Sequence, residues 1–534
     1  MAVDSLRARK ALPQDALEAD WRLKAMDRLA GVRLTRVGVA GLILLLTLIS
    51  LALRVRQLGF HFWIDEGISV GIASHPLSQL PHLLREDGSP PLYYFLLHVW
   101  MQVFGHSEKA THELSLVFAL LSVPVAYLGA TSLFGRRVGA YCALLAAGLP
   151  FITSYAQETR MYSLVLLLSL IAAVGFLHAF VYHRRRWLPV FALALVAMLY
   201  THNWALFFGL MTFVGFLLCV RMTPREERRG LWRDGVVAFG IVALLYLPWV
   251  PTLLYQAQHT GAPWALPPIL WSFTQGGYFI VGGRGAGVAI LLGAGAGLLA
   301  IRNSGPSDRR TRIAVACLAV LGIGTVVIAW LYAKTTPAWA FRYLAVVIGP
   351  LLLLAGLGMA RASKLGLVTL LLVCSFWVLD PVTSIIDAKS NVATAAAKIK
   401  ADDQPTTWVI STQPEQVPTL SYYLPKVIHF ETPLGPVADP RVMDWRNALQ
   451  RFEHGSVHKT LLPMLRQLTP GEHLAFVEPV RFTKEPRWLD LVYTNSYFWD
   501  RYLKRDPKLK LIGQFAPYAY ETGLPVRIVL YSVR

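Results

Sequence analysis

Long apolar runs, separated by short segments rich in arginine, are the feature that most constrains the fold of this chain. Hydrophobic residues make up 55% of the 534 residues and charged residues only 16%, which is more apolar side chains than a soluble core needs. Runs of this length are typical of helices that cross a bilayer, because backbone groups in lipid must be paired within their own segment. The sequence therefore predicts an all-α polytopic membrane domain.

Positive charge is distributed as in the cytoplasmic loops of a membrane protein. The formal net charge is +19, but lysine and arginine occur in clusters between apolar runs and do not form one stripe. We therefore expect no nucleic-acid partner, and we expect the clusters to lie in the cytoplasm. The clusters are at 136–137, 183–186, 221–233, 302–312 and 361–364.

Keeping these clusters on one side of the membrane determines the order of the crossings. A single crossing must then separate the segment 57–112 from Arg136, and the apolar run 91–104 is too short to be another, so we expect it to lie along the outer membrane surface. An odd number of crossings leaves the N-terminus in the cytoplasm and the C-terminus outside. We predict about eleven spans, near residues 37–53, 113–133, 138–153, 161–181, 187–201, 205–220, 234–250, 286–301, 313–332, 342–360 and 365–380.

Composition divides the chain into three parts. Residues 1–35 are a polar cytoplasmic segment, and residues 36–380 are the transmembrane domain, with 57–112 as its first outer loop. Residues 381–534 are predicted to form a soluble α/β domain on the outer side, because strand-like runs alternate with amphipathic or polar stretches. The strand-like runs are 407–411, 473–477, 509–515 and 526–532.

Polar residues gather at the outer ends of the predicted spans. Asp65 and Glu66 follow Trp63 and Ile64 directly. Carboxylates at the rim of a membrane protein are costly to hold there, so they are functional candidates. Acids, a histidine and cations together have the chemistry to activate a hydroxyl and to stabilise a phosphate leaving group. Further candidates on the same predicted face are Asp87, Tyr93, Glu158, Arg160, Tyr162, His202, Lys334, Arg342 and Tyr343.

Five segments of the chain resemble the GT-C fold glycosyltransferases related to protein O-mannosyltransferases and the lipid A aminoarabinose transferase. They are 63–66, 87–94, 157–162, 200–202 and 342–344, and the resemblance covers roughly residues 36–380. It implies transfer of a hexosyl or pentosyl group from a polyprenyl-phosphate-linked donor to a hydroxyl of a cell-envelope glycolipid, polysaccharide or protein. It also implies a multi-pass protein of the bacterial inner membrane with a periplasmic active site.

Residue roles are also implied by the resemblance. Asp65 matches the acid that acts as general base toward the acceptor, and Glu66 is its partner. The available cations for the leaving phosphate are Arg160, Arg342 and Lys334. Arginine suits phosphate best, because its guanidinium can engage two oxygens at once. The remaining candidates would contact substrate.

Several candidates have a structural alternative. Asp65 would also serve as the N-cap of the helix that follows it, and Asp87 precedes a Gly-Ser-Pro-Pro turn. Glu158 and Arg160 would also make a surface ion pair with each other. A histidine or an arginine at the membrane interface, such as His202 or Arg342, can be an ordinary interfacial residue.

The cofactor requirement stays open. Glu66, Glu158 and His202 are residue types that bind divalent ions, so a metal site formed by them is an alternative, although no ligand spacing identifies one. A transporter or flippase of a lipid-linked or small-molecule substrate is the main alternative function. Transporters often contain repeats and polar residues near the bilayer midplane. This chain shows neither, so we favour the glycosyltransferase.

Overall fold

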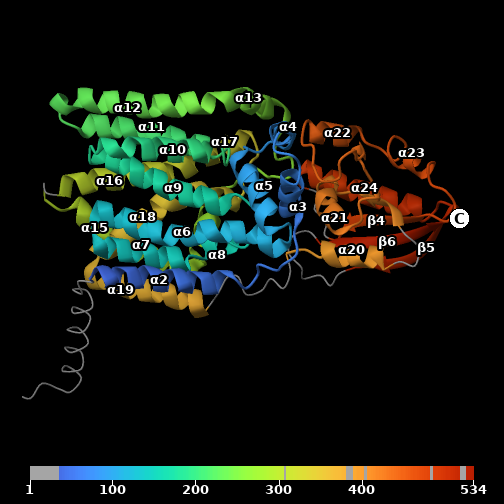
Figure 1. Ribbon diagram of the computed structural model, residues 1–534, viewed down its shortest axis with the longest axis horizontal. Helices are drawn as coiled ribbons and strands as arrows, with labels where there is room; N and C mark the ends of the chain where they lie inside the picture. The colour runs from blue at the N-terminus through green and yellow to red at the C-terminus, as the bar shows by residue number, and fades with distance from the viewer. Residues whose placement is uncertain (1–34, 306–307, 380–388, 402–405, 481–484, 517–524) are drawn as a thin grey trace, which may run out of the picture.

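The computed structural model describes residues 35–305, 308–379, 389–401, 406–480, 485–516 and 525–534. Figure 1 shows a bundle of long helices, most of them running in the same direction or its reverse, with a smaller domain docked on one end of the bundle. Both parts of the predicted fold class, a helical membrane domain and a C-terminal α/β domain, are present.

Helices occupy every predicted span position. Among the described residues, eight helical segments are long and apolar enough to cross a membrane by length and composition. The predicted spans near 138–153, 187–201 and 365–380 contain shorter helices, so the total of about eleven spans stays a prediction. The bundle helices are α2 (Arg36–Arg54), α6 (Glu108–Phe134), α7 (Arg136–Gly148), α8 (Pro150–Tyr155), α9 (Tyr162–Phe176), α10 (Leu188–Leu199), α11 (Ala205–Met222), α12 (Arg225–Tyr246), α15 (Arg284–Arg302), α16 (Arg309–Ala319), α17 (Thr325–Thr335), α18 (Ala345–Arg361) and α19 (Ser363–Leu379).

A buried arginine stabilises the break between α7 and α8. Pro150 begins α8 and has no N–H to continue the hydrogen bonds of α7. Arg54, which is fully buried at the end of α2, donates hydrogen bonds to the carbonyls of Ala146 (2.8 Å) and Ala147 (3.1 Å). It therefore satisfies carbonyl groups that the end of a helix leaves unpaired.

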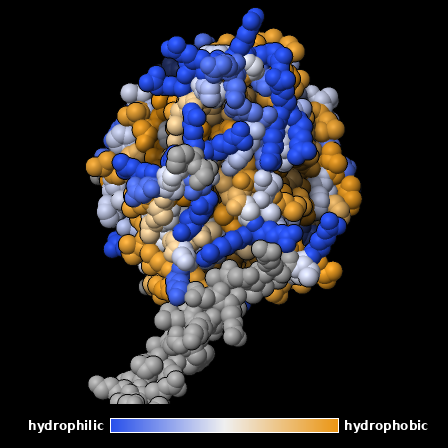
Figure 2. All heavy atoms as spheres, turned by 90° about the vertical axis from the view of Figure 1, so that its left-hand side faces the viewer, coloured by the Kyte–Doolittle hydropathy of each residue, from blue (hydrophilic) through white to orange (hydrophobic). Residues whose placement is uncertain are grey.

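The basic clusters share the end of the bundle that lies opposite the C-terminal domain. Figure 2 looks onto this end, where hydrophilic side chains gather within a rim of apolar ones. Arg185 pairs there with Asp234 (2.9 Å), and Arg361 pairs with Asp308 (3.3 Å). The basic clusters thus have a common side, as expected from the placement of the spans.

Three short helices lie where the bundle meets the C-terminal domain (Figure 1). They are α3 (Ile64–Ala73), α4 (Leu80–Asp87) and α5 (Leu92–Phe104). The 13 residues of α5 cover the run that was predicted to be too short to span. Two further helices, α13 (Val250–His259) and α14 (Trp271–Val281), precede α15.

The C-terminal domain is built on one six-stranded sheet with the order β3-β2-β1-β4-β6-β5. Strand β1 is parallel to β2 and to β4, and the other pairs are antiparallel. The four predicted strands are present, and β2 and β3 are too short to leave a periodic pattern. The strands are β1 (Thr406–Ser411), β2 (His429–Thr432), β3 (Gly435–Pro436), β4 (His473–Pro479), β5 (Leu509–Phe515) and β6 (Val526–Val533).

Helices cover both faces of this sheet, as expected of an α/β domain. One hydrophobic cluster joins α20 (Val392–Lys400) and α21 (Val417–Tyr423) to the sheet, and a second joins α23 (Leu461–Leu465) and α24 (Arg487–Leu503) to the opposite face. Successive strand residues such as Val409 and Ile410 belong to different clusters, because side chains alternate across a strand.

The domain docks on α3 through small residues of that helix. An ideal Cβ at Gly67 would lie 2.7 Å from the Cα of Thr419, and one at Gly71 would collide with the carbonyl of Arg441. His75 lies just beyond α3, and its Nε2 is 2.6 Å from Asp439 Oδ2. The domain backbone therefore approaches α3 more closely than any side chain on that face would allow.

Candidate active site

Asp65 lies in the first turn of α3, but it is not the cap of that helix. Trp63 is the N-cap residue, and Oε2 of Glu66 accepts a long hydrogen bond from its backbone N–H (3.4 Å). A glutamate at this position reaches back to the N-cap in a capping box. The side chain that helps to cap α3 is therefore that of Glu66, and the Asp65 side chain makes other contacts.

Two arginines from distant segments converge on the carboxylate of Asp65. Arg342 Nη2 lies 3.4 Å from Asp65 Oδ2, and Arg160 Nε lies 3.9 Å from the same oxygen. Arg160 also donates hydrogen bonds to the Asp65 carbonyl (3.2 Å) and to Ser69 Oγ (2.9 Å), one turn further along α3. The Arg160 guanidinium thus pairs with Asp65, whereas its contact with Glu158 is a backbone hydrogen bond from the Arg160 N–H to the Glu158 carbonyl (2.8 Å).

The charged groups of Asp65, Arg160 and Arg342 lie close together, yet some of their hydrogen-bonding atoms stay without a partner. Asp65 Oδ2, Arg160 Nε and Arg342 Nε are buried and make no hydrogen bond. Both cation-to-carboxylate distances exceed the roughly 2.7–2.9 Å of a charge-assisted hydrogen bond. Two guanidinium groups face one carboxylate, so the centre has an excess of positive charge and unused donors, which suits an anionic ligand.

Glu66 faces a different set of partners from its neighbour. Its Oε1 accepts hydrogen bonds from Lys389 Nζ (2.8 Å) and from the backbone N–H of Thr159 (2.8 Å), and lies 2.6 Å from His112 Nε2. The side chains of Glu66 and His112 are fully buried. Burial alone would raise the pKa of Glu66, but the charges of Lys389 and His112 hold it below its usual range. Glu66 is therefore a buried anion that joins α3, α6 and the segment before α20.

Asp87 is the last residue of α4 and precedes the left-handed Gly88 (φ 95°), so it does lie at a turn. Burial raises the pKa of Asp87 to about 6, while a hydrogen bond with Ser89 and the charge of Arg160 act in the opposite direction. Asp87 therefore forms part of the turn after α4, as the structural alternative expects, and its burial favours the protonated form.

Tyr93 supports the site from behind. It is fully buried, and its hydroxyl lies 3.5 Å from Ser115 Oγ. Ser115 in turn donates a hydrogen bond to the Arg160 carbonyl (3.1 Å). Tyr93 is therefore linked to the Arg160 backbone through the Ser115 side chain.

Glu158 carries an unpaired oxygen into the same neighbourhood. Its Oε2 is buried and makes no hydrogen bond. Burial raises the pKa of Glu158 to about 7; Lys389 lowers it, and the negative charges of Glu66 and Asp65 raise it. A substantial fraction of Glu158 is therefore protonated and uncharged at neutral pH.

Aromatic rings and a histidine adjoin the arginines. The His202 ring lies 4.9 Å from the Tyr343 ring and 6.0 Å from the Tyr162 ring. His202 Nδ1 accepts a hydrogen bond from the Trp204 N–H (3.1 Å), which leaves Nε2 to carry the proton of the neutral ring. Burial lowers the pKa of His202 to about 3, and the charges of Arg160 and Arg342 lower it further. His202 is thus a neutral donor beside the centre.

The two remaining predicted cations have different surroundings. The Arg342 guanidinium lies 4.8 Å from the Trp264 ring centroid and 5.7 Å from that of Trp63, so it is both paired and enclosed by aromatic faces. Lys334 is exposed and lies 4.6 Å from the ring of Trp330. The described contacts therefore join Arg342, but not Lys334, to Asp65.

The residues named for a metal site do not assemble into one. Among the described residues, no group of three or more His, Cys, Asp or Glu side chains lies close enough to hold a metal ion. Glu66, one of the three, already contacts Lys389 and His112. The donor set around Asp65 is cationic, which favours anions over metal ions.

Two residues that contact Glu66 were missed by sequence reasoning. His112 stands at the edge of a predicted span, and Lys389 lies between the last span and the first predicted strand. Neither belongs to a motif or to a periodic run. Only the folded chain shows that they share a buried carboxylate.

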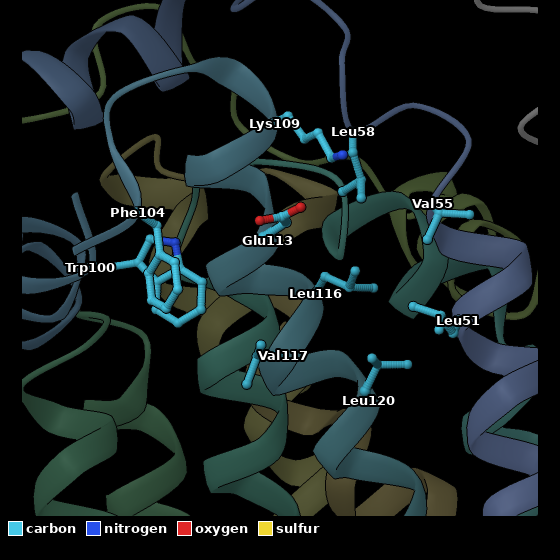
Figure 3. Close-up of a pocket in the computed structure, with 10 residues that line it drawn as sticks. All are labelled: Leu51, Val55, Leu58, Trp100, Phe104, Lys109, Glu113, Leu116, Val117 and Leu120. Atoms are coloured by element: carbon cyan, nitrogen blue, oxygen red, sulfur yellow. The ribbon is translucent and has the colours of Figure 1, made fainter.

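A separate cavity of about 430 Å³ opens between α2, α5 and α6 (Figure 3). Its lining is mostly apolar, with Lys109 and Glu113 as the charged members. Leu58, which lines it, accepts a hydrogen bond from His112 Nδ1 (2.7 Å) through its carbonyl. The cavity therefore adjoins His112, which contacts Glu66, and Asp65 is not among its lining residues.

The chain matches one family model over part of its length and is similar in structure to several known proteins. Residues 88–250 match the family model described as dolichyl-phosphate-mannose-protein mannosyltransferase. The chain is similar in structure to ArnT from Cupriavidus metallidurans in the apo state, with a TM-score of 0.59 and 13% identity, over 93% of this chain and 98% of that one. This chain has the GT-C fold of integral membrane glycosyltransferases.

Two further GT-C structures are similar over most of the chain. ArnT from the same organism bound to undecaprenyl phosphate gives a TM-score of 0.57 at 14% identity, with 92% of this chain and 98% of that chain covered. The oligosaccharyltransferase of Archaeoglobus fulgidus in complex with Zn and sulfate gives 0.53 at 12% identity, with 82% and 67% covered. No match is found among curated proteins. The structural similarity to ArnT includes both the helical bundle and the C-terminal domain, since 93% of this chain is covered.

Proposed function

We propose that this chain transfers a sugar from a polyprenyl-phosphate-linked donor to a hydroxyl group of a cell-envelope acceptor, at the extracytoplasmic end of the bundle. The observation that carries the proposal is the convergence of Arg160 and Arg342 on one oxygen of Asp65. A base and two phosphate-binding cations are the groups such a transfer needs. The similarity to ArnT bound to undecaprenyl phosphate supports a lipid-phosphate donor.

Asp65 is the general base in the proposed reaction. Its Oδ2 makes no hydrogen bond, so it can accept the proton of the acceptor hydroxyl. The acceptor oxygen then forms a bond to the anomeric carbon as the bond from that carbon to the phosphate oxygen breaks. A positioned base contributes roughly a hundredfold to ten-thousandfold to such a rate.

Arg160 and Arg342 stabilise the phosphate that leaves with the electron pair of the broken bond. Their guanidinium groups hold unused donors in a buried setting, where a charge-assisted hydrogen bond is stronger than in water. His202 adds a neutral N–H donor beside them. Glu66 holds the start of α3 in place, and so positions Asp65 without contacting the reacting atoms.

We infer the membrane orientation from charge. The basic clusters lie at the end of the bundle opposite the C-terminal domain, whereas α3, which carries Asp65, lies where the bundle meets that domain (Figure 1). Clusters of this kind are typical of the cytoplasmic side. The active site and the C-terminal domain would then face the periplasm, and the protein would be a multi-pass protein of the bacterial inner membrane. The acceptor would be an envelope glycan, lipid or protein.

Replacement of Asp65 by Asn tests the proposal. Envelope glycolipids and polysaccharides are compared by mass spectrometry in cells without the gene, with the wild type and with Asp65→Asn. A glycosylated product that depends on the wild type and is absent with Asp65→Asn is expected. Asp490→Asn is the matched control, since Asp490 forms a surface pair with Arg487. Wild-type product levels with a folded Asp65→Asn protein would contradict the role of Asp65.

A further inference from the structure

The C-terminal domain brings two buried oxygen atoms without hydrogen-bond partners toward α3. They are Oε2 of Glu415 and Oε1 of Gln413. Glu415 is 4% exposed and Gln413 is 1% exposed. A buried polar atom left unpaired destabilises the folded protein, so two such acceptor oxygens indicate a missing hydrogen-bond donor.

Both side chains are fixed in position. Glu415 Oε1 accepts hydrogen bonds from Trp488 Nε1 (3.0 Å) and from Gln413 Nε2 (3.2 Å). Trp488 is itself fully buried, with its ring 5.3 Å from that of Trp445. One oxygen of each side chain is therefore left free while the rest of each group is held.

The segment that carries these residues is docked against the helix of Asp65. It begins the turn Pro414–Gln416, which continues into α21. Thr419 of α21 packs on Gly67, and Tyr423 accepts a hydrogen bond from the Phe62 N–H (2.8 Å) just before α3. The turn Pro414–Gln416 itself lies against α3, as α21 does, so Glu415 lies at the boundary between the C-terminal domain and the helix of Asp65.

We propose that Glu415 and Gln413 accept hydrogen bonds from hydroxyl or amino groups on the sugar portion of a substrate bound at Asp65. This inference rests on the proposed function and adds a residue pair that sets substrate specificity. Two acceptor oxygens match groups that donate, and a sugar presents several such groups. The phosphate of a donor is excluded from this position, because a carboxylate and an unprotonated amide oxygen repel it.

The test compares Glu415→Gln with Glu431→Gln. Glu431 is also a buried glutamate with an unpaired oxygen, but it lies in β2, and burial alone raises its pKa. Product formation is measured by mass spectrometry in cells that make each variant. Binding of undecaprenyl phosphate, which carries no sugar, is measured by the thermal shift of each purified variant.

Each result of this comparison supports or overturns the proposal. Glu415→Gln is expected to lower product formation by about tenfold to a hundredfold, the loss of one hydrogen bond to a charged group, while its undecaprenyl phosphate shift and the Glu431→Gln protein stay at wild-type values. Equal losses in Glu415→Gln and Glu431→Gln, or loss of the undecaprenyl phosphate shift, would overturn it. Unchanged product in folded Glu415→Gln would also overturn it.

Gln413→Leu removes the second free oxygen without a change of charge, and it serves if Glu415→Gln does not fold. A rise in KM for the radiolabelled lipid-linked donor would assign the contact to the transferred sugar, and a rise in KM for the acceptor would assign it to the acceptor. If wild-type cells and cells without the gene yield identical envelopes, the proposed function itself fails, and this inference fails with it.

Discussion

Lys389 Nζ lies 2.8 Å from Oε1 of Glu66, so the first described residue after the membrane helices contacts the first turn of α3. Oε1 of the same glutamate lies 2.6 Å from His112 of α6. Ser390 extends the contact by donating a hydrogen bond to the Phe62 carbonyl (2.6 Å). The start of the C-terminal part is thereby joined to the residue next to Asp65.

Loss of Lys389 is expected to destabilise the protein. Lys389→Met leaves the buried Glu66 without its lysine partner, and removal of one partner of a buried pair costs about 3–5 kcal/mol. Thermal unfolding of the purified protein measures the loss. The double variant Glu66→Gln with Lys389→Met should recover part of it. Lys504→Met, which removes an exposed pair with Asp500, should cost about 1 kcal/mol or less. A similar loss of stability in Lys389→Met and Lys504→Met would show that the buried pair with Glu66 stabilises the protein no more than an exposed pair does.

Arg342 should affect the rate of transfer far more than stability. Arg342→Met removes a phosphate ligand, and loss of one such group lowers kcat by about a hundredfold to a thousandfold. Arg342→Lys keeps the charge but not the two-pronged donor, so a smaller loss is expected. Turnover of a radiolabelled donor in membranes measures both, with Arg361→Met, at the basic end, as control. Turnover at the control rate in Arg342→Met would remove Arg342 from the mechanism.

Glu158 should make stability depend on pH. Its pKa is raised to about 7 by burial, against about 4.3 in an unfolded chain. The neutral form is the one that suits the folded state, so its contribution is complete below pH 4 and is lost as the pH rises through about 7. Thermal midpoints measured from pH 5.5 to 8.5 should fall in the wild type relative to Glu158→Gln. Parallel curves for the two proteins would contradict this assignment.

The orientation of the bundle can be tested by labelling. Ser78, between α3 and α4, and Arg225, at the start of α12, are both exposed. An impermeant thiol reagent added to intact cells should modify Ser78→Cys, and it should reach Arg225→Cys only after permeabilisation. Of the native cysteines, Cys142, Cys219 and Cys317 are buried and Cys374 is partly buried, so background labelling should be low. The reverse pattern would invert the proposed topology.

Much of the fold follows from local sequence, because apolar runs determine helices in a bilayer and alternating runs determine strands. The convergence of Asp65, Arg160 and Arg342 agrees with the face predicted for them. The orientation of the Glu66 side chain could not be predicted from its place next to Asp65. Neighbouring side chains on a helix point roughly 100° apart, so two adjacent carboxylates need not enter the same site.

Long-range partners were the other omission. Lys389 meets Glu66 only after the chain has crossed the whole membrane domain. Glu415 lies in a short turn of the C-terminal domain, where no periodic pattern indicates its burial. Contacts of this kind depend on how two domains dock, and a single sequence carries no local signal for them.

Gly67 and Gly71 make α3 a component of both domains at once. One side of this ten-residue helix carries Asp65, and another admits the backbone of the C-terminal domain. A methyl group added at either glycine would push that domain away and would disturb the helix that carries the carboxylate. The packing at Gly67 and Gly71 leaves no space for a ligand, so a substrate of the proposed reaction would reach Asp65 from another side of α3.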